Sequence, residues 1–172
     1  MSIDSENNYS CTGFHGTNSE SANSILSSNT FLDSQDEEEW LGTGVYFFED
    51  DVQQAVNYIY KAKRVVNFKI IQADINTNKL LNLVDTKTYE QFESFAKKFQ
   101  NRYKTRKDYS KRKLINAVIL DAMYKLEPYE VVRAVFPVPK TKYAPRTNIQ
   151  PVQIQVCVRK HDCISNIKEV EV

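Results

Sequence analysis

Residues 40–48 constrain what this chain can fold into more than any other stretch. Two of the four glycines in the chain, Gly42 and Gly44, stand here one residue apart, directly before β-branched and aromatic residues that predict a strand. The other two, Gly13 and Gly16, lie on either side of a histidine. Glycine has no Cβ and lets a backbone approach a ligand closely, but such pairs are equally typical of turns that lead into strands.

Hydrophobic periodicity predicts the order of the elements. Strand patterns cover residues 9–15, 40–48, 65–75, 80–83, 129–136, 152–159 and 164–172, and helical patterns cover residues 19–26, 52–62, 86–103 and 110–126. We expect the short strand at 80–83 to continue the strand before it, and Pro128 to end the last helix. This order predicts one α+β domain with an antiparallel sheet, preceded by a polar tail at residues 1–8.

Size and composition narrow the class of protein. The chain has 172 residues, 41% of them hydrophobic, which is enough for one domain with its own core. No apolar run approaches the roughly 20 residues of a membrane span, and the polar start is unlike a signal peptide, so we expect a cytosolic (cytoplasmic) protein without a membrane partner. Three cysteines without metal-ligand spacing predict reduced thiols and no metal site.

Charge is divided unevenly along the chain. Residues 1–60 contain eleven acidic residues and no Lys or Arg, whereas residues 61–172 hold all 23 basic residues and eleven acids, so the two parts carry −11 and +12. Such a division can join two halves of one fold or give the molecule a basic face for an acidic partner. The sequence leaves both interpretations open.

Residues 97–113 are the most basic stretch, with nine Lys or Arg residues, one acid and interleaved aromatic rings. Aromatic rings among cations suit single-stranded nucleic acid, where bases stack and phosphates pair with basic groups. The candidate contacts are Lys104, Arg106, Lys107 and Arg112. A solvated basic turn, or attraction to the acidic part of the same chain, explains the pattern as well.

Three strand segments together resemble the motifs of the ADP-ribosyltransferase superfamily, in its diphtheria-toxin and poly(ADP-ribose) polymerase-like (His-Tyr-Glu) branch. They are residues 14–17 (Phe-His-Gly-Thr), 42–47 (Gly-Thr-Gly-Val-Tyr-Phe) and 153–156 (Gln-Ile-Gln-Val), and residues 55–58 (Ala-Val-Asn-Tyr) match the helix that follows the second motif. The resemblance spans nearly the whole chain in the family's order. It implies a single ADP-ribosyltransferase-like domain over residues 9–172, with a split mixed or antiparallel sheet and flanking helices.

The resemblance implies that NAD is the substrate and is held bent in one slot formed by these segments, without a metal. The residues implied to bind NAD are His15, Gly16, Thr17, Gly44, Tyr46 and Tyr58. His15 would bond the adenosine ribose with support from Thr17, and the main chain of Gly16 would read the nicotinamide carboxamide. Tyr46 and Tyr58 would enclose the nicotinamide ring. Each of these side chains also has an ordinary interpretation, as a strand-end hydrogen bonder or as core packing.

The third motif departs from the family, which has a Glu where this chain has Gln155. The implied catalytic residues are therefore His15, Tyr46 and Gln155. An amide donates and accepts hydrogen bonds but offers no negative charge to an oxocarbenium ion, so we expect single transfer or loss of activity rather than polymer elongation. Gln153 resembles a position that helps choose the acceptor. Glu38, Glu39 or Glu130 would supply a carboxylate if the fold brought one near.

Three hypotheses follow from the sequence. The first is a toxin-like or effector-like mono-ADP-ribosyltransferase that uses NAD and modifies a protein or a nucleic acid, with an antitoxin or a host protein as a further partner. The second is a pseudo-enzyme that binds NAD or ADP-ribose without turnover. An NAD glycohydrolase lies between them.

Overall fold

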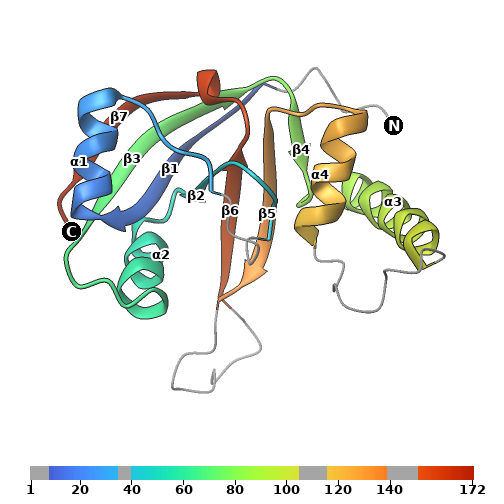
Figure 1. Cartoon of the computed structure of the whole chain (residues 1–172), viewed down its shortest axis with the longest axis horizontal. Coiled ribbons are helices and arrows are strands. Elements are labelled where there is room, and N and C mark those ends of the chain that lie inside the picture. The colour runs from blue at the N-terminus through green and yellow to red at the C-terminus, as the bar shows by residue number, and fades with distance from the viewer. Residues whose placement is uncertain (1–7, 35–39, 105–115, 139–150) are drawn as a thin grey trace.

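One mixed sheet extends across the molecule, with the strand order β4-β5-β6-β2-β1-β3-β7 (Figure 1). The computed structural model describes residues 8–34, 40–104, 116–138 and 151–172. Within them the strands are β1 (Tyr9–Asn18), β2 (Val45–Glu49), β3 (Phe68–Thr77), β4 (Leu80–Asn82), β5 (Val131–Pro137), β6 (Val152–Val158) and β7 (Ile164–Val170). The helices are α1 (Ser19–Ser28), α2 (Val52–Val56), α3 (Thr86–Lys104) and α4 (Asn116–Leu126), with a π-helical turn η1 (Asn57–Ala62) and a 3-10 turn η2 (His161–Cys163).

The predicted α+β class is confirmed, because strands and helices share one sheet-based fold. Neighbouring strands are antiparallel except β4 and β5, which run parallel, so the sheet is mixed. The short strand predicted at residues 80–83 is present as β4, but it pairs with β5 and does not continue β3. Leu80 pairs with Val131 of β5, and the amide of Glu130 donates to the carbonyl of Lys79 at 2.9 Å, which holds this segment beside β5.

The strand expected at residues 40–48 begins only at Val45. Gly42 has φ +82° and Gly44 has φ +152°, and both values interrupt an extended backbone. Residues 40–44 therefore form a loop that leads into β2. The loop carries Trp40, whose ring packs on Phe136 of β5.

Side-chain oxygens cap the start of two of the helices. Asn18 Oδ1 accepts from the amide of Ser21 at 2.8 Å before α1, and Asp51 Oδ1 accepts from the amide of Gln54 at 3.1 Å before α2. The helix expected over residues 52–62 is α-helical at first and ends in the π-helical turn η1. Of the helix expected from residue 110, residues 110–115 lie outside the described residues.

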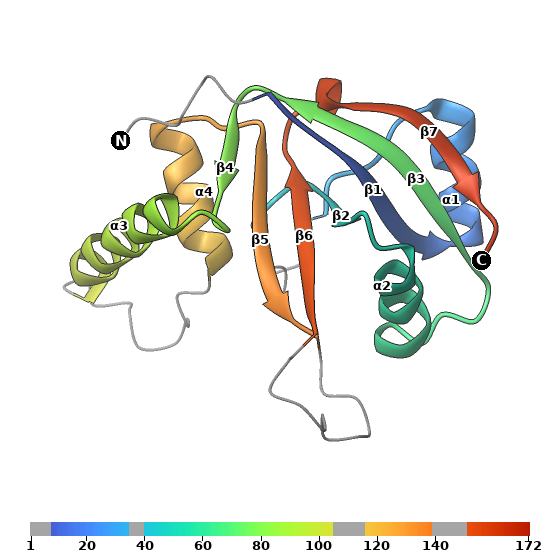
Figure 2. The ribbon, with the colours of Figure 1, turned by 180° about the vertical axis from the view of Figure 1, so that it is seen from behind.

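Hydrophobic side chains form cores on both faces of the sheet. Successive strand residues point to opposite faces, and accordingly Phe47 belongs to the core under α1 whereas Phe48 belongs to the core under α2 and η1. Helices α3 and α4 cover a third core, over β4, β5 and β6. The view from behind shows the long strands β1, β3 and β7 crossing the molecule away from α3 and α4 (Figure 2).

The two central strands, β1 and β2, separate soon after they meet. β1 pairs with β3 along its whole length, from Tyr9 opposite Thr77 to Asn18 opposite Phe68. Its pairing with β2 is restricted to Gly13 opposite Glu49 and Phe14 opposite Phe48. The C-terminal part of β1 and the N-terminal part of β2 therefore lie beside each other without the ladder of hydrogen bonds that joins other strands.

Candidate functional site

The three sequence motifs lie on strands that are neighbours in the sheet. The first motif is on β1, the second enters β2, and the glutamines of the third are on β6, which pairs with β2. In that pairing Tyr46 lies opposite Cys157, and Phe48 lies opposite Gln155. Segments more than a hundred positions apart in the sequence thus meet in the middle of the sheet.

His15 bridges the place where β1 and β2 separate. Its Nδ1 lies 2.8 Å from the main-chain oxygen of Tyr46. A carbonyl oxygen only accepts, so we assign the proton of the neutral ring to Nδ1, which leaves Nε2 as a hydrogen-bond acceptor. The ring meets Phe31 and Phe47 edge-on, with centroids 5.4 and 5.9 Å away. Burial lowers the pKa of His15 below its ordinary 6.5, and this outweighs the opposite effect of the Tyr46 carbonyl.

The peptide groups of Gly16 point into the same gap. Thr12 directs its peptide toward β2, because its oxygen accepts from the amide of Asp50 at 2.8 Å and its amide donates to Asp50 Oδ1 at 3.1 Å. Peptide groups alternate sides along a strand, so those of Gly16 also face β2. The β1–β2 register ends at Phe14, and these groups of Gly16 have no β2 partner among the described residues.

The absence of a side chain at Gly16 also lets the helix above approach the strand. A Cβ at Gly16 would lie 2.8 Å from the carbonyl oxygen of Ala55 and 3.0 Å from Cβ of Ile59. Any larger residue would therefore push α2 and η1 away from β1. This packing explains the glycine without a ligand, and it also fixes the helix that carries Tyr58.

Tyr46 directs its ring to the opposite face of the sheet from His15. The imidazole packs beside Phe47, whereas the ring of Tyr46 packs beside Leu41. Its hydroxyl donates to the carbonyl of Gly42 at 2.7 Å and accepts from the amide of Leu41 at 2.9 Å. The expected single slot is therefore not lined by both rings on one face: His15 reaches Tyr46 through the main chain.

Tyr58 lies on the same face of the sheet as Tyr46. Tyr58 is in η1 and is 37% exposed, and its ring lies 5.8 Å from the ring of Phe48, which is two residues along β2 from Tyr46. The Nζ of Lys63 lies 5.6 Å from the centroid of the Tyr58 ring, within the range of a cation–π contact. The two tyrosines expected around a nicotinamide ring thus lie on one face of the sheet. The ring of Phe48 on β2 lies next to that of Tyr58.

Gly44, expected to contact NAD, is accounted for by packing within the protein. A Cβ there would lie 2.6 Å from Sγ of Cys157 and 2.7 Å from the oxygen of Val158. The carbonyl of Gly44 accepts from the amide of Ser34 at 2.9 Å. Gly44 therefore allows close packing of this loop against β6.

The two glutamines of β6 lie on the face that carries Tyr46. Gln155 lies opposite Phe48 on β2 and Ala134 on β5, and Gln153 lies opposite Phe136 on β5. Neither side-chain amide has a hydrogen-bond partner among the residues that the structure describes. Gln153 is 8% exposed, and among the described residues the buried side-chain polar atom without a hydrogen-bond partner is Nε of Arg159.

Glu130, one of the three carboxylates expected as substitutes for the family's Glu, does not lie beside Gln155. Glu130 lies just before β5, four positions from the Ala134 that faces Gln155. It bonds Lys160 at 2.9 Å and Thr77 at 2.8 Å, and these hydrogen bonds lower the pKa of Glu130. Glu38 and Glu39 lie outside the described residues. Thr17 lies two residues beyond His15 on the same face, without a hydrogen bond to it in the described structure.

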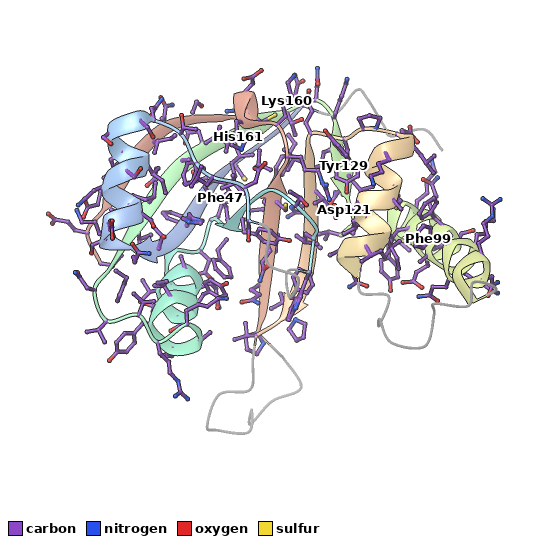
Figure 3. All side chains as sticks on the ribbon, viewed as in Figure 1. Phe47, Phe99, Asp121, Tyr129, Lys160 and His161 are labelled. Atoms are coloured by element: carbon purple, nitrogen blue, oxygen red, sulfur yellow. The ribbon has the colours of Figure 1, made fainter. Side chains whose placement is uncertain are left out.

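Arg159 is a site-supporting residue that sequence reasoning missed. Its side chain is 6% exposed, and its Nη2 lies 2.7 Å from Asp121 Oδ1 and donates to the carbonyl of Leu41 at 3.2 Å. The guanidinium carbon lies 4.8 Å from the ring centroid of Tyr124 and 5.1 Å from that of Tyr129. Figure 3 shows Asp121 and Tyr129 near each other between α4 and β5. This ion pair holds the loop whose backbone binds the hydroxyl of Tyr46.

A second ion pair joins β2 to β5 on the face that carries His15. Glu49 accepts from Arg133 Nε at 2.5 Å and from Nη2 at 2.7 Å, and also from the hydroxyl of Tyr9 at 2.7 Å. Another contact between the acidic and basic parts of the chain joins Asp33 to His161 at 2.8 Å. These contacts support the interpretation that the uneven charge holds one fold together.

The candidate nucleic-acid contacts cannot be placed. Arg106, Lys107 and Arg112 lie outside the described residues, as does the side chain of Lys104 at the end of α3. The three cysteines, all described, form no disulfide with one another. Among the described residues, no group of His, Cys, Asp and Glu is arranged to hold a metal ion, and no helix is long and apolar enough to cross a membrane.

Comparison with known proteins gives one relative without a known activity. An uncharacterized protein of Methanocaldococcus jannaschii, MJ0359, is 28% identical over 185 aligned positions, which cover 91% of this chain and 86% of that protein. No protein-family model and no solved structure matches the chain. The relative shows that a similar sequence of similar extent occurs in an archaeon.

Proposed function

We propose that this chain is an NAD-dependent mono-ADP-ribosyltransferase, toxin-like or effector-like, with an ADP-ribosyltransferase fold. It would transfer ADP-ribose from NAD to a macromolecular acceptor and release nicotinamide. One observation carries the proposal: β1 and β2 separate beside Gly16, and the His15 imidazole spans the gap to the main chain of Tyr46. Of the residues that the resemblance assigns to NAD, His15, Gly16 and Tyr46 lie beside this interruption, which supports the proposal.

The gap offers separate contacts for the two ends of a bent NAD. On one face, Nε2 of the neutral His15 ring accepts a hydrogen bond from an adenosine ribose hydroxyl. In the gap, the amide and carbonyl of Gly16 match the acceptor and donor of the nicotinamide carboxamide. On the other face, Tyr46 and Tyr58 provide aromatic surface for the nicotinamide ring. The dinucleotide would lie across the interrupted ladder rather than along one face of the sheet.

The reaction requires little proton transfer from these groups. The bond between the ribose and nicotinamide breaks with both electrons going to the nicotinamide, which leaves as a neutral molecule without needing an acid. The ribose carbon gains oxocarbenium character, and a nucleophile of the acceptor attacks it and loses its proton to solvent. Gln155 accepts a hydrogen bond from the 2′-hydroxyl of that ribose but adds no negative charge. Catalysis therefore rests on holding the geometry.

Incubation with NAD labelled in its adenine half tests the proposal. Label on a macromolecule identifies the transferase, label in free ADP-ribose identifies a glycohydrolase, and intact NAD contradicts turnover. We expect His15→Ala and Tyr46→Ala to abolish turnover. His161→Ala is the matched control, because this second histidine bonds Asp33 outside the site and its loss leaves turnover unchanged. Retained activity in both site variants would contradict the proposal.

Gln155 favours one second candidate, an NAD-binding pseudo-enzyme. The side chain stands where the family carries its charged group, and its amide has no partner in the described structure. Such a protein would bind NAD in calorimetry and leave it intact. Binding without turnover by the unaltered chain would select this candidate over the transferase.

A further inference from the structure

We propose that Phe31 is a positioning residue for His15, and that it fixes both the orientation and the neutral form of the imidazole that meets NAD. The inference rests on the proposed function, because it names a residue that serves the same site. Phe31 lies in residues 29–34, the segment after α1, and belongs to none of the three motifs. It reaches the site from outside the segments that the resemblance identifies.

Phe31 completes a cluster of three aromatic rings with His15 and Phe47. The centroid of the Phe31 ring lies 5.4 Å from that of His15 and 5.2 Å from that of Phe47, with the planes inclined at 80° and 71°. The third pair, His15 with Phe47, has centroids 5.9 Å apart and planes inclined at 60°. Such edge-to-face contacts favour one relative orientation of the rings. Phe31 is 2% exposed, so its own ring is enclosed by the protein.

The hydrogen bond of His15 fixes only one atom of its ring. Nδ1 lies 2.8 Å from the main-chain oxygen of Tyr46, and the imidazole could still tilt about this contact. Phe31 packs on the ring from the segment after α1, and Phe47 packs on it from β2, so together they block the tilt. Nε2 then keeps one direction, which a hydrogen bond to a ribose hydroxyl requires.

The surroundings that Phe31 helps to form also keep the imidazole uncharged. Ile71 lies opposite His15 on β3, and Ala22 and Ile25 of α1 belong to the same hydrophobic core as Phe31. Burial among such side chains disfavours the charged ring. A smaller residue at position 31 would admit water to the imidazole and favour its protonation. A protonated Nε2 donates a hydrogen bond and can no longer accept one.

The titratable side chains on the elements packed against His15 do not offset this effect, because they are exposed, neutral or bonded elsewhere. They are Glu20 of α1, which is exposed; Asp33, which bonds His161; Glu49 of β2, which bonds Arg133 and Tyr9; Lys69 of β3, which bonds Glu169; and Cys11 of β1, whose pKa burial raises to about 12. Apolar packing is therefore the main influence on the charge of His15.

The segment that carries Phe31 is held at both ends. Asn29 ends α1 with φ +54°, the left-handed conformation that turns a chain at the end of a helix. The amide of Ser34 donates to the carbonyl of Gly44 at 2.9 Å, which ties the other end to the loop before β2. Between these ends Leu32 is 90% exposed, whereas Phe31 is buried. The backbone thus directs position 31, and not its equally apolar neighbour, toward His15.

Nitrogen NMR of the His15 ring tests the proposal in the absence of NAD. The chain has two histidines, and the resonances of His15 are identified by their loss in His15→Gln. We expect Phe31→Leu to raise the pKa of His15 toward its ordinary 6.5 and to mix the two neutral tautomers. Phe92→Leu is the matched control, because it makes the same change at a buried phenylalanine of α3 and leaves the His15 resonances unchanged.

A second variant, Phe31→Met, removes the ring but keeps a long apolar side chain in the core. It should change the pKa and the tautomer of His15 in the same direction as Phe31→Leu. Circular dichroism confirms that each variant is folded. An unchanged pKa and a single tautomer in both Phe31 variants, or equal changes in Phe92→Leu, would overturn the proposal.

Rates of NAD turnover connect the state of the ring to the reaction. We expect Phe31→Leu to lower kcat/KM for NAD by about threefold to tenfold near pH 6, and by less at pH 8, where the ring is again neutral. Leu32→Ala, one position along the same segment, leaves the rate and its pH profile unchanged because that side chain is exposed. A loss of equal size at every pH, as a merely structural change gives, would overturn the role of Phe31 in the reaction.

The outcomes distinguish this inference from the proposed function. If the unaltered protein leaves NAD intact while Phe31→Leu alters the His15 ring, the transferase is contradicted and the positioning of His15 by Phe31 stands. If NAD is turned over and the His15 ring is unchanged in both Phe31 variants, the transferase stands and this inference is overturned.

Discussion

At the scale of single residues, His15 is held in an uncharged form that suits hydrogen bonding to a ribose. Burial against Phe31 and Phe47 disfavours the charged ring, and the Tyr46 carbonyl fixes the proton on Nδ1. The Nε2 atom is then an acceptor at neutral pH. The same effect makes the folded state resist protonation more than the unfolded chain does.

This resistance predicts how stability depends on pH. The unfolded histidine takes up a proton near pH 6.5, while the folded one does so only at lower pH, so the contribution of His15 is present above 6.5 and is lost as pH falls below it. We expect the free energy of unfolding, measured with urea, to fall by up to about 1.4 kcal/mol for each pH unit below 6.5. His15→Gln should not show this fall. Identical pH profiles for the two proteins would contradict the buried neutral ring.

Gln155 yields a prediction of gained activity. If the neutral amide limits the rate, Gln155→Glu supplies negative charge to the developing oxocarbenium ion and raises turnover of NAD by about tenfold or more. Gln53→Glu is the matched control, because it adds the same charge on the exposed side of α2. Initial rates of nicotinamide release measure both. A rate unchanged or lowered in Gln155→Glu would show that the amide does not stand in for the acid.

Gly44 yields a prediction about stability. Its φ of +152° and the positions of Cys157 Sγ and Val158 O leave no room for a methyl group. We expect Gly44→Ala to lower the free energy of unfolding by about 2 kcal/mol or more, through strain in the backbone and displacement of β6. Thr43→Ala, one residue away, is the control with a small effect. Denaturant titration of both variants decides whether the approach is as close as described.

At the scale of elements, the loop at residues 40–44 connects the ion pair of Arg159 and Asp121 to the ring of Tyr46. Arg159 donates to the carbonyl of Leu41, and the hydroxyl of Tyr46 bonds Gly42 and the amide of Leu41. Position 46 is therefore fixed from two sides, by its strand and by the loop. The orientation of the Tyr46 ring depends on residues from β6 and α4.

A double-mutant cycle tests this connection. Asp121→Asn leaves the buried guanidinium without its counter-charge. We expect it to lower the free energy of unfolding by about 2 kcal/mol, an effect limited by the 38% exposure of Asp121. Arg159→Met with Asp121→Asn should cost less than the sum of the two single changes. Strict additivity in denaturant unfolding would mean that the two groups do not interact across this loop.

The sequence predicted elements well and their partners less well. Runs of β-branched and hydrophobic residues identified β1, β5 and β6, although β5 and β6 are buried on both faces. It could not reveal that residues 80–82 pair with β5, since a short apolar run carries no information about its neighbour. Nor could it place Arg159, whose burial depends on two tyrosines and a carboxylate from other elements.

The candidate site shows the same limit. The motifs predicted which segments meet, and β1, β2 and β6 are neighbours. They did not predict that His15 and Tyr46 direct their rings to opposite faces, because this depends on the register of β1 against β2, which places Phe14 opposite Phe48. The pairing ends at Phe14, a property of the whole sheet that no local pattern encodes.

At the scale of the whole molecule, β1 and β2 are central strands whose pairing ends early, and the proposed NAD site lies where it ends. Helices α1 and α2 cover the two faces beside it, and the ion pair of Glu49 with Arg133 ties β2 to β5 where the strands still pair. β1 and β2 are therefore paired at Gly13 and Phe14 and unpaired beyond Phe14. A ligand that bonds both peptide groups of Gly16 would complete the ladder.

Nicotinamide binding at Gly16 is the most direct test of the proposed NAD site, because it requires neither turnover nor an acceptor. The measurement is the backbone amide resonance of Gly16 in a ¹⁵N-labelled protein, titrated with nicotinamide and with benzoate as an analogue that lacks the carboxamide. We expect a saturable shift of the Gly16 amide with nicotinamide, absent with benzoate and lost in Tyr58→Ala. An unmoved Gly16 amide at saturating nicotinamide, or shifts confined to residues far from β1 and β2, would contradict it.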